Sequence, residues 1–136
     1  MLFKTLNGRD RDVSLAPYLI DWDRVVSGPQ KAVKDFLFPY WSGKTVCEEF
    51  KIPASRMRVD LLCINDSIMV EVDGAQHDKL NLFMHGSVSG FTAAIKRDLE
   101  KQRWAELNGL QYIVIKQHEI PLLSCEWIEK TFGVVL

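Results

Sequence analysis

Residues 56–78 read RMRVDLLCINDSIMVEVDGAQHD, and this stretch decides the fold. It contains two short apolar runs, VDLLCI and IMVEV, on either side of the turn-forming pair Asn65-Asp66. Two such runs joined by such a pair predict a β-hairpin. Because alternate residues of a strand point to opposite faces, Glu71 and Asp73 share one face of the second strand. The opposite face is apolar and is expected to face a core: Ile68, Val70 and Val72.

Three carboxylates interrupt these apolar runs: Asp60, Glu71 and Asp73. Burying a carboxylate is costly unless it is paired or binds a cation. Hard divalent cations such as Mg²⁺ prefer carboxylate oxygens, so the hairpin predicts a metal or catalytic site. The alternative is a structural ion-pair network in which the same acids bind Arg56, Arg58 or Lys96.

The order of these residues resembles a nuclease pattern. An aspartate-bearing strand followed by Glu71-Val72-Asp73 resembles the PD-(D/E)xK nuclease superfamily. The longer string EVDGAQH, with Arg97-Asp98 on a later helix, is similar to the very-short-patch-repair-type endonucleases and related small phage and homing nucleases. The resemblance covers about residues 31–116. It implies a restriction-endonuclease-like core and a DNA endonuclease that depends on Mg²⁺ or Mn²⁺.

The resemblance also implies roles for individual residues. Asp60, Glu71 and the backbone carbonyl of Val72 would hold the metal ion. His77, neutral near pH 7, would orient the attacking water or accept its proton. Gln76 or a basic residue of the later helix would stabilise the charge that develops on the phosphate.

The chain departs from the superfamily pattern at two places. Asp73 stands where a lysine is usual, so the role of that lysine would fall to His77 or to a basic residue of the later helix. Asp73 itself becomes a further candidate for the catalytic and metal-binding set. A glutamate that many members carry on their first helix is also missing, and its nearest equivalents are Gln30 and Asp35.

Hydrophobic periodicity and turn residues predict the other elements. They indicate a helix from Ser27 that ends at Pro39, a strand over 45–52, a helix over 91–108, a strand over 111–116 and a short helix over 125–132. A strand, a helix and a further strand in this order imply a parallel crossover. We therefore expect an α/β fold with a mixed central sheet flanked by helices.

Simple alternation along 45–52 places Cys47 and Glu49 on one face of the strand, and Val46, Glu48 and Phe50 on the other. One of the two adjacent glutamates, for which we take Glu49, would support the site from outside. The alternative is that the pair is charge on an edge strand, which discourages aggregation.

The helix over 91–108 has an apolar arc that includes Leu99 and leaves Trp104 on the opposite side. Asp98 and Gln102 fall within this arc, one turn apart. They are expected to support the site, or Asp98 pairs with an arginine in the core. The basic residues of the helix and of the hairpin form the predicted DNA-contacting set: Arg56, Arg58, Lys79, Lys96, Arg97, Lys101 and Arg103.

Length and composition set wider limits. The chain has 136 residues, which suits one domain: a 1–26 N-terminal extension, a 27–116 core and a 117–136 C-terminal helix. The formal net charge of −1 does not indicate a strongly basic DNA-binding surface, but a local basic patch is sufficient. The cysteines lack zinc spacing, and no apolar run approaches membrane length. These features predict a cytoplasmic protein that does not bind membranes.

Two broader predictions concern function and assembly. A single acidic site cuts one strand, so cleavage of both strands would require a homodimer or sequential nicks. Because the usual lysine is missing, the alternative function is a nucleic-acid-binding module that has the nuclease fold but does not cleave.

Overall fold

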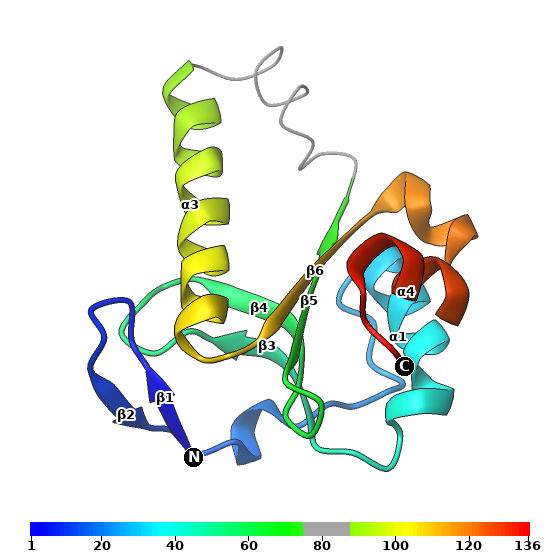
Figure 1. Cartoon of the computed structure of the whole chain (residues 1–136), viewed down its shortest axis with the longest axis horizontal. Helices are drawn as coiled ribbons and strands as arrows, with labels where there is room; N and C mark the ends of the chain where they lie inside the picture. Colours follow the sequence, from blue (N-terminus) through cyan, green and yellow to red (C-terminus); the bar gives the residue numbers. More distant parts are fainter. Residues whose placement is uncertain (75–87) are drawn as a thin grey trace.

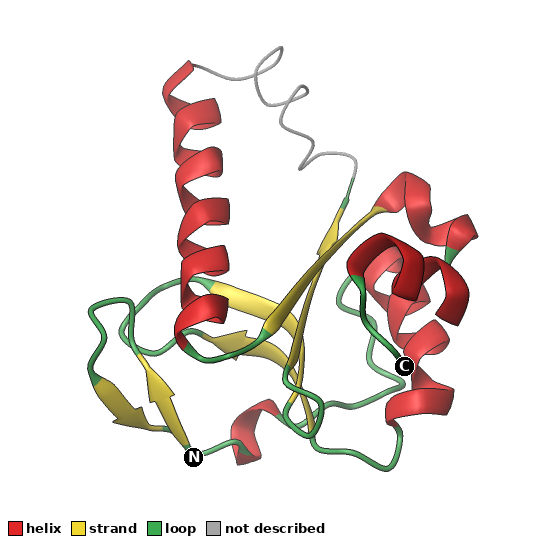
Figure 2. Cartoon of the chain, viewed as in Figure 1, coloured by secondary structure: helices red, strands yellow, loops and turns green. Residues whose placement is uncertain are grey.

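The computed structural model describes residues 1–74 and 88–136. A four-stranded sheet lies at the centre, helices cover both of its faces, and a two-stranded sheet lies beside it (Figures 1 and 2). This arrangement confirms the predicted α/β fold with a mixed sheet. The elements are β1 (Leu2–Lys4), β2 (Asp10–Asp12), η1 (Ala16–Tyr18), α1 (Gly28–Trp41), β3 (Val46–Lys51), β4 (Arg58–Cys63), β5 (Ile68–Asp73), α3 (Val88–Leu107), β6 (Gln111–Lys116), η3 (Gln117–Leu122) and α4 (Cys125–Phe132).

The strands of the central sheet follow the order β3-β4-β5-β6. β4 and β5 form the predicted hairpin, in which Leu61 lies opposite Val70 and Cys63 opposite Ile68. β6 runs parallel to β5, so the predicted crossover through α3 is confirmed. Within the described ranges, no helix is both long and apolar enough to cross a membrane.

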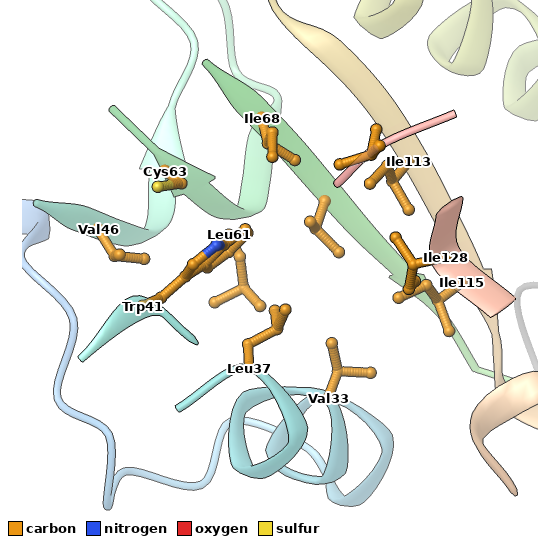
Figure 3. Packing of buried hydrophobic residues seen from close by; sticks show 12 residues of the cluster. Val33, Leu37, Trp41, Val46, Leu61, Cys63, Ile68, Ile113, Ile115 and Ile128 are labelled. Atoms are coloured by element: carbon orange, nitrogen blue, oxygen red, sulfur yellow. The ribbon is translucent and has the colours of Figure 1, made fainter. Parts of the chain in front are cut away.

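Each face of the central sheet has its own hydrophobic core. The α1 core lies between the sheet and helices α1 and α4 (Figure 3); it includes Val33, Leu37, Trp41, Leu61, Val70, Ile115 and Ile128. The α3 core lies on the other face, where α3 and β1 cover it; it includes Phe3, Cys47, Phe50, Val59, Leu62, Met69 and Trp104. The protein is therefore a sandwich of helices, sheet and helix (Figure 1).

The prediction that α1 ends at Pro39 is wrong. The helix begins, as predicted, after Ser27, whose hydroxyl accepts a hydrogen bond from the backbone N–H of Gln30. It then continues past Pro39 to Trp41. Proline removes one backbone donor from a helix, but the two residues beyond it bring the indole of Trp41 into the α1 core, where it is completely buried.

Side-chain alternation breaks at the same point in β3 and β4. Glu48 lies opposite Leu61 and Phe50 opposite Val59, so the register is unchanged on either side of Glu49. Leu61 nevertheless belongs to the α1 core, whereas Phe50 and Val59, two residues further along their strands, belong to the α3 core. The prediction that Phe50 shares a face with Glu48 is therefore wrong.

The cause of this break is a backbone conformation that alternation does not reveal. Glu49 has a φ of 49°, in the left-handed region. Residues other than glycine seldom adopt that region. A single such residue reverses the faces to which the side chains after it point. Both strands change faces together, with Glu49 and Asp60 at the crossing point.

The first 26 residues contribute to the core as well as to the surface. Phe3 is 3% exposed, and its ring lies 5.2 Å from the ring of Phe50 and 5.7 Å from that of Trp104, measured between centroids. The Asn108 carboxamide pairs with the backbone of Lys4, accepting its N–H at 2.7 Å and donating to its carbonyl at 3.2 Å. The N-terminal hairpin is thus bound to the end of α3.

A buried lysine joins the segment before α1 to the sheet. The ammonium of Lys34, on α1, is fully buried and donates to the backbone carbonyls of Asp21 at 2.6 Å and Arg24 at 2.9 Å. It also forms an ion pair of 2.6 Å with Glu48 on β3. The other oxygen of Glu48 accepts the backbone N–H of Asp21 at 3.1 Å. Every proton of this buried ammonium therefore has an acceptor.

We expect Phe3→Ala to lower the free energy of unfolding by about 3 kcal/mol, because it removes a buried aromatic ring and leaves a cavity. Urea unfolding followed by tryptophan fluorescence measures the change. Leu2→Ala is the matched control, because Leu2 is 67% exposed on the same strand. Its effect should stay within about 0.5 kcal/mol. Equal effects of the two substitutions would contradict the packing of β1 described above.

Candidate functional site

Asp60 and Glu71 lie on adjacent strands, and each bonds the other strand's backbone. The backbone N–H of Asp60 donates to Oε2 of Glu71 at 3.3 Å, and the backbone N–H of Val72 donates to Oδ2 of Asp60 at 2.8 Å. In the ladder between β4 and β5, the first pair is Cys63 with Ile68 and the last pair is Leu61 with Val70. The two carboxylates therefore replace backbone acceptors where this ladder ends, and the structure brings the two predicted metal ligands together.

Glu71 also faces a lysine from α3. Its side chain is 6% exposed, and its Oε1 forms an ion pair with the ammonium of Lys101, which is 20% exposed. The expectation that Lys101 belongs to the outer, phosphate-facing surface is wrong. The alternative partners predicted for these acids lie elsewhere. Arg56 and Arg58 are exposed, and the ammonium of Lys96 lies 3.9 Å from Oε1 of Glu100.

The surroundings of Glu71 disfavour its charge. Burial is the largest cause that raises its pKa, followed by the negative charge of Asp60 and by a hydrogen bond with it. The ammonium of Lys101 lowers the pKa in part, but the net shift is upward. The site therefore holds Glu71 where its ionisation is disfavoured, beside the carboxylate of Asp60 and the ammonium of Lys101.

A tyrosine shows that more acids converge on this region. Burial raises the pKa of Tyr112 on β6, and the charges of Glu71, Asp98, Asp73 and Asp60 raise it further. Asp73 and Asp98, both predicted from the sequence, thus act electrostatically on the same tyrosine as Asp60 and Glu71.

Helix α3 presents a face to the sheet that differs in part from the one predicted. Ala94 and Ala105 are buried, as predicted, whereas Leu99 is 61% exposed. Trp104, predicted on the opposite side, is fully buried and packs against Phe3 of the N-terminal segment. Burial of the large indole sets the rotation of the helix. Lys101 and Asp98 are half-buried, whereas Gln102 is exposed, so the expected support of the site by Gln102 is wrong.

A pocket of about 210 Å³ lies beside Asp60, between the start of α1 and the sheet. Gln30 is 4% exposed, and its Nε2 donates to Oε1 of Glu49 at 3.3 Å. Asp35, the other candidate on this helix, is exposed and pairs with Lys31. The lining includes Pro29, Gln30, Glu49, Asp60, Val72 and Gly74.

Asp60 lines this pocket and Glu71 does not, and their neighbouring carboxylates are donors that suit a hard divalent cation. Among residues 1–74 and 88–136, no set of three or more His, Cys, Asp or Glu side chains is arranged to hold a metal ion. The site does offer two neighbouring carboxylates, Asp60 and Glu71. Oε1 of Glu71 is buried and forms an ion pair with Lys101, whereas Oε2 accepts the backbone N–H of Asp60. Asp60, Glu71 and the carbonyl of Val72 could hold such an ion.

The remaining predicted residues divide into two groups. Gln76, His77 and Lys79 lie outside the described residues. The other basic side chains predicted to contact DNA are exposed: Arg56, Arg58, Lys96, Arg97 and Arg103.

We expect Glu71→Gln to stabilise the protein near neutral pH. The pKa of Glu71 is raised in the folded protein. In the unfolded chain Glu71 therefore loses its proton at a lower pH, near the ordinary glutamate pKa of about 4.3. Folding stability therefore decreases as the pH rises above that value. The glutamine variant has no such dependence, so its advantage in melting temperature should grow from about pH 5 to about pH 8. An advantage that shrinks over this range would contradict the raised pKa.

The hydrogen bonds, burial and charges of this chain's own residues define the site. No family model, no curated protein and no solved structure matches the chain.

Proposed function

We propose that this protein is a metal-dependent endonuclease that hydrolyses phosphodiester bonds of DNA. The observation that carries the proposal is the meeting of Asp60 and Glu71 on adjacent strands, each bonded to the other strand's backbone. Contact between two acids disfavours a purely structural ion-pair network, because the negative charge of Asp60 raises the pKa of Glu71. The nuclease-like order of the same residues in the sequence supports the same conclusion.

The chain's own groups would divide the work as follows. Asp60, Glu71 and the carbonyl of Val72 would hold Mg²⁺ or Mn²⁺. A bound divalent cation polarises the phosphate and lowers the pKa of an attacking water. The hydrogen bond from the N–H of Val72 to Oδ2 fixes the direction of the Asp60 carboxylate.

Lys101 would supply the positive charge that the sequence pattern lacks at position 73. Its ammonium contacts Glu71, although it projects from a helix and not from the strand. A lysine is a compact point charge on a flexible stem. It is therefore suited to turn from Glu71 toward the phosphate when a metal ion neutralises the carboxylate, and to stabilise the charge that develops there.

A second function is favoured by the same ion pair. If Lys101 keeps Glu71 neutralised, and Asp73 provides no lysine, the domain would bind nucleic acid through its exposed arginines and lysines without cleaving it. Cleavage assays separate the two functions.

We expect the purified protein to nick supercoiled plasmid DNA with Mg²⁺ or Mn²⁺ and to lose this activity in EDTA. Asp60→Asn and Glu71→Gln should abolish cleavage, because both remove a charged metal ligand while they retain its shape. Asparagine at position 60 still offers an acceptor to the N–H of Val72, so the fold should survive. Glu106→Gln, at an exposed acid of α3, is the control and should cleave normally. Full activity of Asp60→Asn would refute the proposed site, and binding without cleavage by the wild-type protein would favour the second function.

We expect Lys101→Met to lower kcat by about 10²–10³-fold, the usual loss when one group that stabilises the transition state is removed. The ammonium also lowers the pKa of Glu71. Its removal should therefore shift the acidic limb of the pH–rate profile to higher pH. Lys130→Met on α4 is the control, since this side chain is exposed on another helix. An unchanged kcat and pH profile in Lys101→Met would exclude this role.

A further inference from the structure

Glu49 combines an unusual backbone conformation with a buried hydrogen-bond partner. Its φ of 49° lies in the left-handed region, where a residue with a Cβ atom is strained. Its carboxylate accepts a hydrogen bond of 3.3 Å from Gln30, whose side chain is 4% exposed. Glu49 and Gln30 line the same pocket as Asp60. Strain of this kind persists only where surrounding contacts hold it, and such residues cluster at functional sites.

The position of Glu49 in the sheet connects this strain to Asp60. Glu48 pairs with Leu61 and Phe50 pairs with Val59, so Glu49 and Asp60 stand between the same two rungs of the ladder. The register is the same before and after them, which shows that neither strand has an inserted residue. β3 and β4 can therefore change faces only together.

This coupling determines the direction in which the Asp60 side chain points. In two regularly alternating strands, Asp60 would share a face with Leu62 and would point into the α3 core. At the crossing point it turns instead toward β5, where it accepts the N–H of Val72 at 2.8 Å. The left-handed residue on β3 is thus a condition for the orientation of the carboxylate on β4.

We propose that Gln30 and Glu49 form a positioning pair, in which the Gln30 amide holds Glu49 in the left-handed conformation that directs the Asp60 carboxylate toward Val72 and the adjoining pocket. The effect on cleavage rests on the proposed nuclease function. The effect on the orientation of Asp60 does not, so the two are tested separately.

The orientation is tested by hydrogen exchange of the Val72 amide, measured by NMR. Glycine adopts the left-handed region freely, whereas a β-branched residue there is an outlier. Glu49→Gly should keep the Val72 amide protected, and Glu49→Val should lose that protection. Lys51→Gly and Lys51→Val are matched controls on the same strand, because Lys51 is not one of the described residues with a positive φ. Lys51→Val should leave the Val72 amide protected.

Amides distant from the site distinguish local change from unfolding. The N–H groups of Ile113 and Ile115 on β6 should remain protected in every variant that folds. If Glu49→Val does not fold, Glu49→Ala replaces it, because alanine is also strained at this φ but smaller. Equal protection of Val72 in the glycine variant and in the folded valine or alanine variant would overturn the proposal.

Cleavage kinetics test the role of the pair in the reaction. Glu49→Val should lower kcat by about 100-fold with little change in KM, since a displacement of about 1 Å in a catalytic group has effects of this size. Gln30→Ala should lower kcat in the same direction. Glu49→Gln should restore much of the activity, because its amide oxygen still accepts the hydrogen bond from Gln30. Wild-type kcat in both Gln30→Ala and Glu49→Val would overturn the proposal.

The two proposals fail in different ways. A wild-type protein that cleaves no DNA with any divalent metal would refute the nuclease function, and the exchange of the Val72 amide would still decide the role of Glu49. A wild-type protein that cleaves, with variants equal to it in both measurements, would refute only the positioning pair.

Discussion

The fold and the site depend on one constraint: two carboxylates must be accommodated inside a sheet whose neighbouring residues are apolar. The structure meets it by ending the ladder between β4 and β5 at Leu61 and Val70 and letting the acids accept the next backbone N–H groups. A buried donor or acceptor left without a partner costs about 1–3 kcal/mol. The exchange between Asp60 and Glu71 therefore keeps the strands together while it holds both carboxylates at one place.

The layers around the sheet then bring other groups to that place. α3 is fixed by the burial of Trp104, and the same rotation brings Lys101 against Glu71. On the other side, α1 is fixed by Val33, Leu37 and Trp41 in its core, and its first turn brings Gln30 to Glu49. The site lies where these two layers meet the interrupted ladder. Its strained and partly uncompensated groups oppose stability, a compromise that is common where a protein has a function to perform.

The sequence allowed the prediction of those features that depend on hydrophobic patterning. The hairpin, the parallel crossover onto β6 and the helix at Cys125–Phe132 all follow from apolar runs and turn residues. The meeting of Asp60 and Glu71 followed as well, because neighbouring strands of a tight hairpin fix which residues lie opposite each other. These predictions used only local rules.

The features that could not be predicted depend on single residues that override such rules. The left-handed conformation of Glu49 has no signal in its residue type, and it moved Phe50 to the other face. Periodicity alone misplaces the rotation of α3 and puts Lys101 on the surface, because one buried indole outweighs several smaller apolar residues. Helix α1 passes Pro39 for the same reason, since Trp41 lies beyond it.

The buried ammonium of Lys34 has a consequence for how this chain assembles. Its acceptors come from positions 21, 24 and 48, on both sides of the lysine in the chain. None of them can compensate the desolvated charge alone, so a half-assembled chain would bear the cost of the buried cation without its full coordination. Such a network penalises intermediates in which the segment before α1 has docked but β3 has not. It therefore favours an all-or-none transition, in which this side of the molecule closes around its charge in a single event.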